Sequence, residues 1–90
     1  MTKGQATIGN SLGLHARPAM TFVQCASAFA STIRVRRCDV AEWVDGKSIM
    51  QMLLLAATCG SRLEVECSGL DEQAALDALL DLINRRFDEE

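Results

Sequence analysis

His15 is the only histidine among the 90 residues, and its neighbours in the sequence could hold an anion. The stretch 10–19 begins with asparagine, serine and glycine, which are typical of a loop that leaves a side chain accessible. Pro18 suits the first turn of a helix, because amides there have no partner within the helix. The amides of Ala16 and Arg17, with the Arg17 guanidinium, would surround an anion at this helix N-terminus. A neutral imidazole in this position could accept a phosphoryl group.

The residue types around His15 also allow a simpler interpretation. Most single histidines beside a helix start are surface side chains or local caps, so a small α/β interaction or RNA-binding module is an alternative. The net charge of -3, with three Phe, one Trp and no Tyr, argues against nucleic acid, which usually requires a basic face and stacking aromatic residues. We therefore expect the partners to be other proteins.

Composition indicates one soluble globular domain, residues 1–90, with a core of modest size. The apolar content is 49% and the charged content 23%, and no apolar run reaches the 18 or so residues needed to span a bilayer. Residues 1–5 lack the apolar segment of a signal peptide. We expect a cytoplasmic protein without membrane insertion.

The four cysteines are too far apart in the sequence to begin a zinc site, and they stand at positions 25, 38, 59 and 67. We predict no metal and no cofactor. Cys25 and Cys67 lie at positions where the periodic pattern of their predicted helix or strand is apolar. They are expected to be reduced thiols in the core.

Hydrophobic periodicity predicts an α+β protein with the element order βαββαβα. Alternating residues predict strands at 3–9, 32–38 and 62–67, with a short edge strand at 42–44 after a turn around Asp39. Apolar residues at helical spacing predict helices at about 16–29, 49–57 and 71–87, with Gly60 ending the second helix. This order favours an antiparallel sheet with the helices on one face.

Charges on two of these strands predict that they lie side by side. Arg34 and Arg36 face outward on one strand, and Glu64 and Glu66 do so on the other. Opposite charges across a strand pair stabilise it by a few tenths of a kcal/mol each.

Core-facing stripes are expected on the first and last helices. The first stripe comprises Ala19, Phe22, Val23, Ala26 and Phe29 or Ala30. The last comprises Ala75, Leu76, Leu79, Leu80, Ile83 and Phe87. Acidic residues at 71 and 72 and basic residues at 85 and 86 match the dipole of that last helix.

The second helix is apolar on every side, so a 90-residue domain cannot bury all of it. A methionine-rich exposed face suits adaptable binding to several partners. Met52 and Leu54 could equally belong to the core. Ser48 comes directly before this helix and is expected to be its N-cap, which is worth about 1 kcal/mol.

Two segments of the chain resemble the HPr family, the histidine-containing phosphocarriers of the bacterial sugar phosphotransferase system. Residues 13–19, Gly-Leu-His-Ala-Arg-Pro-Ala, resemble the active-site segment, and residues 45–50, Asp-Gly-Lys-Ser-Ile-Met, resemble the regulatory-serine segment. The resemblance covers essentially the whole chain. It implies an open-faced β-sandwich: a four-stranded antiparallel sheet with three helices on one face.

The resemblance also implies a function. His15 would accept a phosphoryl group at Nδ1 from phosphorylated enzyme I and pass it to an enzyme IIA domain, so the protein would be a carrier and not an enzyme. Ser48 would be the target of an HPr kinase/phosphorylase in organisms that have one, and a phosphate there would weaken partner binding. The first two helices would contact partners through Met20, Gln24, Ile49, Met50 and Leu53. A regulatory paralogue, in a nitrogen or global-control branch, is an alternative, and we expect a monomer.

Overall fold

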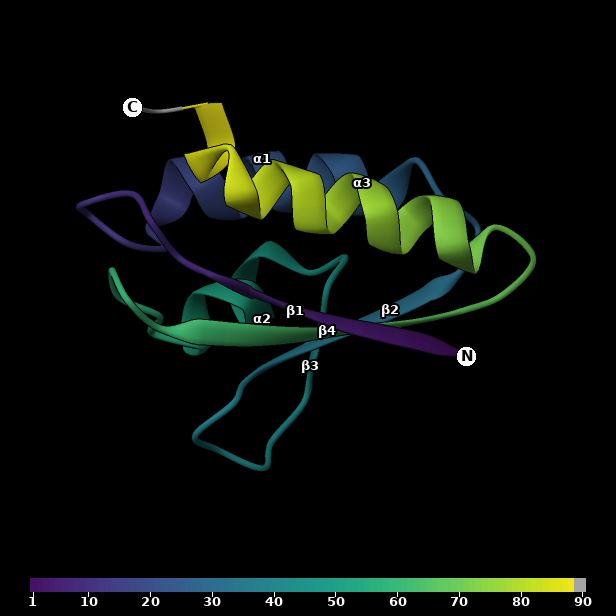
Figure 1. Ribbon diagram of the computed structural model, residues 1–90, viewed down its shortest axis with the longest axis horizontal. Helices are drawn as coiled ribbons and strands as arrows, with labels where there is room; N and C mark the ends of the chain where they lie inside the picture. The colour runs from purple at the N-terminus through teal and green to yellow at the C-terminus, as the bar shows by residue number, and fades with distance from the viewer. Residues whose placement is uncertain (89–90) are drawn as a thin grey trace.

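The computed structural model describes residues 1–88 and confirms the order βαββαβα (Figure 1). The strands are β1 (Thr2–Thr7), β2 (Thr32–Arg37), β3 (Val44–Asp45) and β4 (Arg62–Ser68). The helices are α1 (Ala16–Ser27), α2 (Ile49–Leu54) and α3 (Glu72–Asn84), followed by a short 3-10 turn, η1 (Arg86–Asp88). The strands form one sheet in the order β1-β4-β2-β3, and all neighbours are antiparallel.

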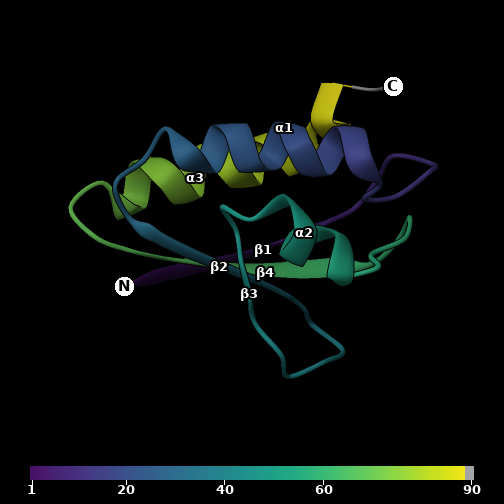
Figure 2. The same ribbon diagram turned by 180° about the vertical axis from the view of Figure 1, so that it is seen from behind.

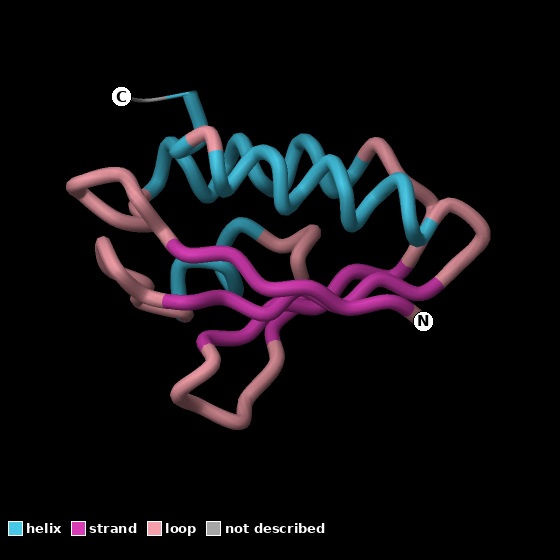
Figure 3. Tube along the Cα trace, viewed as in Figure 1, coloured by secondary structure: helices cyan, strands magenta, loops and turns pink. Residues whose placement is uncertain are grey.

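The helices lie on one side of the sheet. Figures 1 and 2 show α1 and α3 side by side above it, with α2 between α1 and the β3 edge. The loop between β2 and β3 extends on the other side, as the tube in Figure 3 shows. This arrangement confirms the predicted open-faced sandwich. No helix within residues 1–88 is long and apolar enough to cross a membrane.

The core lies between the sheet and the helices, and it confirms most of the expected stripes. On α1, the buried residues are Pro18, Ala19, Phe22 and Ala26. On α3, they are Ala75, Leu76, Leu79, Leu82 and Ile83. The prediction omitted Leu82 and overvalued Leu80, which is only partly buried. Leu80 packs over β1, where a Cβ added to Gly4 would lie 2.6 Å from its Cδ1.

The outer face of the sheet carries the predicted charge pairs between β2 and β4. Arg34 is opposite Glu66 and Arg36 is opposite Glu64 in the strand register. The Nη2 to Oε1 distances are 2.6 Å and 2.8 Å, respectively. Trp43 lies against both guanidinium groups, with its ring centroid 4.7 Å from Cζ of Arg34 and 5.2 Å from Cζ of Arg36. These cation–π contacts cover part of the outer face.

The position of Trp43 explains why the edge strand differs from its prediction. Residues 42–44 were expected as the strand, but pairing with β2 begins only at Val44 and ends at Asp45. The indole contacts the outer face immediately before this pairing begins. The strand is therefore shifted toward the C-terminus and contains only two residues.

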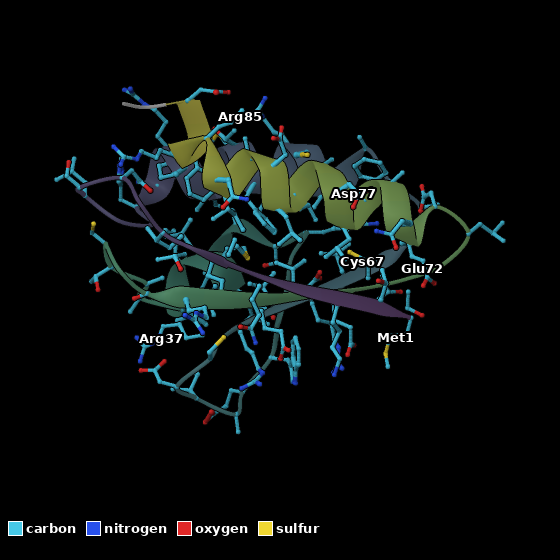
Figure 4. The ribbon with its side chains drawn as sticks, viewed as in Figure 1. Met1, Arg37, Cys67, Glu72, Asp77 and Arg85 are labelled. Carbon is cyan, nitrogen blue, oxygen red and sulfur yellow. The ribbon has the colours of Figure 1, made fainter. Side chains whose placement is uncertain are left out.

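The second helix is shorter than predicted, and Gly60 does not end it. α2 stops at Leu54, and Ala56 takes a left-handed φ of 51°. Arg37 Nη1 donates to the Leu55 carbonyl oxygen at 3.1 Å, which satisfies a group left open at the helix end (Figure 4). Its Nε also pairs with Asp39 at 3.0 Å, and this hydrogen bond lowers the pKa of that carboxyl group.

The last helix also ends early, so the prediction of a helix to residue 87 is wrong. α3 ends at Asn84, and Arg86, Phe87 and Asp88 have φ values of 58°, 55° and 60°. This left-handed turn buries Phe87, which is 3% exposed, although it is not on the helix. Arg85 and Arg86 consequently lie beyond the last helical turn.

Asp71 precedes α3 and does not cap it through its side chain. Its carboxylate accepts hydrogen bonds from the Ala30 amide at 2.8 Å, the Ser31 amide at 3.0 Å and the Ser31 hydroxyl. These bonds lower the pKa of Asp71, the Ser31 hydroxyl contributing most. They connect the segment after α1 to the start of α3.

The two cysteines expected in the core differ in burial. Cys67 is fully buried beneath the start of α3 (Figure 4), whereas Cys25 is only partly buried. Burial, followed by the nearby carboxylates of Glu72, Asp71 and Glu66, raises the pKa of Cys67 to about 11. Burial also raises the pKa of Cys25, against the opposing charge of Arg85. The Cys67 thiol is therefore protonated at neutral pH.

Candidate functional site

His15 is the N-cap residue of α1. Its backbone is extended, with φ -96° and ψ -168°, and its carbonyl oxygen accepts the first helical hydrogen bond, from Ala19 N at 3.0 Å. The imidazole makes no capping hydrogen bond to its own helix. His15 is partly exposed. The ring is thus held at the edge of the helix N-terminus, and its side chain is not used to close that terminus.

The loop before His15 is held by backbone hydrogen bonds to a distant segment. Leu14 N donates to Ala57 O at 2.9 Å, and the buried Asn10 donates through Nδ2 to Gly13 O at 2.6 Å. Gly13 has a φ of +71°, and a Cβ there would lie 2.7 Å from Ala57 O and 2.8 Å from Thr58 Cα. Only glycine fits this combination of left-handed φ and close approach. The segment after α2 therefore sets the position of His15.

The first turn of α1 provides backbone amide donors. Ala16 and Arg17 are its first residues and both are exposed. Their amides precede Ala19, whose amide makes the first intrahelical bond, so they belong to the orphan donors of a helix start. The first turn contains no acidic residue. A helix of 12 residues adds the positive end of its dipole at the same place.

Pro18 occupies the third position of α1 and is buried, which agrees with its expected place in the first turn. Proline lacks an amide hydrogen, so its presence there costs the helix no hydrogen bond. The sequence thus builds the start of α1 from a loop that ends at His15, two exposed residues with amide donors, and a proline that packs inward.

The second helix begins at Ser48, which is confirmed as its N-cap: Oγ accepts from Gln51 N at 3.3 Å. The Gln51 side chain returns to accept from Asp45 N at 2.8 Å. Ser48 thus supplies one half of a capping box, but the Gln51 side chain binds the Asp45 amide and not the amide of Ser48, which donates to Asp45 O at 3.1 Å.

Apolar side chains are exposed on both α1 and α2, which contact each other. We name the exposed members of the two helices the apolar patch: Met20, Met50, Leu53 and Leu54, which are 52%, 76%, 40% and 77% exposed. Of the two residues left open by the sequence, Met52 is fully buried and Leu54 is exposed. Exposed apolar surface of this kind is typical of binding sites.

The other residues expected at the partner surface divide between the core and solvent. Ile49 is partly buried and packs against the core, whereas Gln24 on α1 is exposed. Leu12, in the loop before His15, is 77% exposed and was not predicted. A leucine between loop-forming residues gives no periodic signal, so its exposure could be found only from the structure. Within residues 1–88, no three His, Cys, Asp or Glu side chains gather in a way that could hold a metal ion.

Comparison with known proteins assigns the chain to a family. The family model described as "PTS HPr component phosphorylation site" matches residues 2–85. The phosphocarrier protein HPr of Pseudomonas aeruginosa is 48% identical over 85 residues, covering 94% of this chain and 93% of the relative. The phosphocarrier protein NPr of Proteus mirabilis is 38% identical over 86 residues, covering 96% and 94%.

A solved structure agrees with the fold. HPr from Thermoanaerobacter tengcongensis has 42% sequence identity and a TM-score of 0.92, covering 100% of this chain and 99% of the other. The match therefore extends from the two short motifs to the arrangement of the whole chain. The chain belongs to the HPr family, the phosphocarrier proteins of the phosphotransferase system.

Proposed function

We propose that this protein receives a phosphoryl group on His15 from phosphorylated enzyme I and transfers it to an enzyme IIA domain. In the first step, the bond between phosphorus and the donor histidine breaks as a bond to His15 Nδ1 forms. In the second step, the acceptor takes the group and His15 is regenerated. The protein contributes positioning and charge stabilisation, and no net chemistry remains on it after one cycle.

The observation that carries this proposal is the placement of His15 at the N-cap of α1, with a side chain that does not cap its helix. Phosphoryl transfer through a loose transition state depends on positioning and on groups that offset negative charge. The loop fixed to Ala57 supplies the positioning. The amides of Ala16 and Arg17, and the Arg17 guanidinium, supply the charge stabilisation.

The apolar patch supports transfer between proteins. A carrier must bind its donor and then its acceptor at the same reactive nitrogen, so its docking surface must accept different partners. Methionine side chains suit this task because they are flexible and polarisable. Met20, Met50 and Leu53 would form the centre of this surface, with Gln24, Ile49 and Leu54 at its margin.

Ser48 is the second proposed site of phosphorylation, by an HPr kinase/phosphorylase where the cell has one. The dianion would lie at the N-terminus of α2, where positive potential tolerates it. It would also stand within two residues of Met50 in the sequence, and burying it under a partner would cost desolvation energy. The proposed effect is weaker docking with the fold intact.

Labelled phosphoenolpyruvate and enzyme I test the central proposal. Wild-type protein is expected to take up one equivalent of phosphate in an acid-labile, alkali-stable linkage, and the His15→Ala variant none. A Lys3→Ala variant, at an exposed position on β1 outside the proposed surface, serves as a folded control that retains His15. Equal incorporation by His15→Ala and wild type would refute the proposal.

A regulatory branch is the second candidate, because the chain is also 38% identical to a phosphocarrier protein NPr. The identity to HPr of Pseudomonas aeruginosa is higher, at 48%, which favours the sugar branch. Phosphorylated protein mixed with enzyme IIA domains of each branch distinguishes the two. Faster transfer to a sugar-specific domain supports the sugar branch, and the reverse assigns the protein to the regulatory one.

A further inference from the structure

The turn after α3 reaches the base of the His15 loop. In Figures 1 and 2, η1 lies at the end of the molecule where the loop before α1 is found. A Cβ added to Gly9 would lie 3.1 Å from Nε of Arg86, 3.4 Å from its Cγ and 3.7 Å from its Cδ. The Arg86 side chain therefore crosses the backbone of Gly9, the residue directly before the buried Asn10.

This contact depends on an unusual backbone. Arg86, Phe87 and Asp88 all have left-handed φ values, which are unfavourable for non-glycine residues. Burial of Phe87 offsets part of that cost. The reversal at the end of α3 thus places Phe87 in the core and directs Arg86 toward the loop.

The neighbouring arginine has a different environment. Arg85 Nε lies 3.5 Å from Asp81 Oδ2 and 3.7 Å from Asp88 Oδ1, so two carboxylates offset its charge. The Arg86 side chain is the one that lies against the backbone of Gly9. Arg85 and Arg86 are therefore a matched pair for substitution, because only Arg86 lies against the loop at Gly9.

Gly9 is held from its other side as well. Ile8 N donates to Ser61 O at 2.8 Å, Gly60 N donates to Ile8 O at 2.8 Å, and Cys59 Sγ lies 3.8 Å from Gly9 O. The base of the loop is consequently enclosed between the segment 59–61 and the Arg86 side chain.

We propose that Arg86 is a positioning residue for phosphoryl transfer: it packs across Gly9 and orders the loop that carries His15. This inference rests on the proposed function of His15. Arg86 need not touch the phosphoryl group, because a shift of the loop alone would misalign the imidazole.

The test compares Arg86→Gln with Arg85→Gln, which removes the same charge one residue away. Arg86→Gln is expected to lower the maximal rate of transfer from phosphorylated enzyme I by about fivefold, which corresponds to roughly 1 kcal/mol. The enzyme I concentration at half-maximal rate should change little, because the apolar patch is intact. Arg85→Gln should keep the wild-type rate, and Arg86→Lys should recover most of it.

Gly9→Ala provides the reciprocal test. Gly9 is not in the left-handed region, so alanine is tolerated there, but its Cβ must displace the Arg86 side chain. Gly9→Ala should slow transfer to a similar extent, and the double variant with Arg86→Gln should be no slower than either single variant. Additive effects would show that the two residues act separately and would overturn the inference.

Backbone amide chemical shifts of the unphosphorylated protein separate this inference from the proposed function. Arg86→Gln should move the signals of residues 9–14, whereas Arg85→Gln should leave them in place. Wild-type protein that accepts no phosphate would refute the proposed function, whatever the shifts. Wild-type transfer with equal rates for Arg86→Gln and Arg85→Gln, or unchanged loop signals, would refute the role of Arg86.

Discussion

The starts of α1 and α2 are built from similar parts and use them differently. Each helix begins at a polar residue in extended conformation, His15 for α1 and Ser48 for α2. Ser48 accepts a hydrogen bond from its own helix, whereas His15 does not use its side chain as a cap. The cap of α2 stabilises the helix directly. The start of α1 keeps its amide donors available for a ligand, and the segment after α2 maintains its shape instead.

Because of this difference, the start of α1 depends on contacts with distant residues more than the start of α2 does. The hydrogen bonds at the start of α2 are local, because they join Asp45, Ser48 and Gln51 within seven residues. The His15 loop is fixed by Ala57, more than forty residues away in the sequence. The site at α1 therefore requires the folded sheet and helices.

Gly13→Ala should have the largest effect on stability. The new Cβ would combine a left-handed φ with a 2.7 Å approach to Ala57 O, so the free energy of unfolding should fall by about 2–4 kcal/mol. Gly60→Ala is the matched control, since Gly60 has a φ of +93° and open space around its Cβ position. It should lose only about 1 kcal/mol. Urea unfolding of both variants measures the difference, and equal losses would mean that Ala57 does not constrain the loop.

Arg17→Ala should slow phosphoryl transfer about ten- to a hundredfold, because one donor to the developing charge is removed. The fold should be unchanged, since Arg17 is exposed. Lys3→Ala removes one positive charge from an exposed position on the outer side of the sheet and should leave the rate as it is. Single-turnover transfer from phosphorylated enzyme I gives both rates. If the two variants are equally slow, overall charge and not the start of α1 controls the rate.

Two substitutions at Ser48 separate capping from docking. Ser48→Ala should reduce the free energy of unfolding by about 1 kcal/mol and leave transfer through His15 unchanged. Ser48→Asp retains a good N-cap and adds a charge, so it should remain folded and bind enzyme I about tenfold more weakly. Thermal melts and titration with enzyme I distinguish these outcomes. A Ser48→Asp variant that binds as well as wild type would remove the regulatory proposal.

Substitution of Asp71, at the start of α3, should have the smallest effect on stability, and this effect should depend on pH. The hydrogen bonds from Ser31 and Ala30 lower the pKa of Asp71 below 3.8. Its contribution is therefore present above that value and is lost as the pH falls through the lowered pKa. Asp71→Asn should be less stable than wild type at pH 7, and the difference in stability should close as the pH falls through the lowered pKa of Asp71. A difference in stability that persists at low pH would show that the charge of the Asp71 carboxylate does not cause it.

Much of the architecture could be predicted because its causes are local. Alternation identified the strands, and the charges of Arg34, Arg36, Glu64 and Glu66 paired β2 with β4 correctly. The helical stripe of α1 and the cap at Ser48 were also predictable, since each depends on residues within a turn or two. The loop and helix start around His15 belong to this group.

The errors occurred where a distant contact overrides the local pattern. The apolar run of α2 continues to residue 57, yet the helix stops at Leu54, where Arg37 from β2 binds its end. Phe87 fits the stripe of α3 but becomes buried through a left-handed turn. No local signal in the sequence indicates either event, and Arg86 at Gly9 depends on the second of them.

Trp43 has a practical consequence for studying this protein. It is the only tryptophan in the chain, and it lies with Arg34 and Arg36 on the side of the sheet opposite the helices. Its fluorescence should change when the sheet unfolds, because Arg34 and Arg36 then no longer lie against the indole ring. His15, the proposed phosphorylation site, begins α1 on the other side of the sheet (Figure 1), so the same emission is expected to give an unfolding signal that is insensitive to the loading of His15.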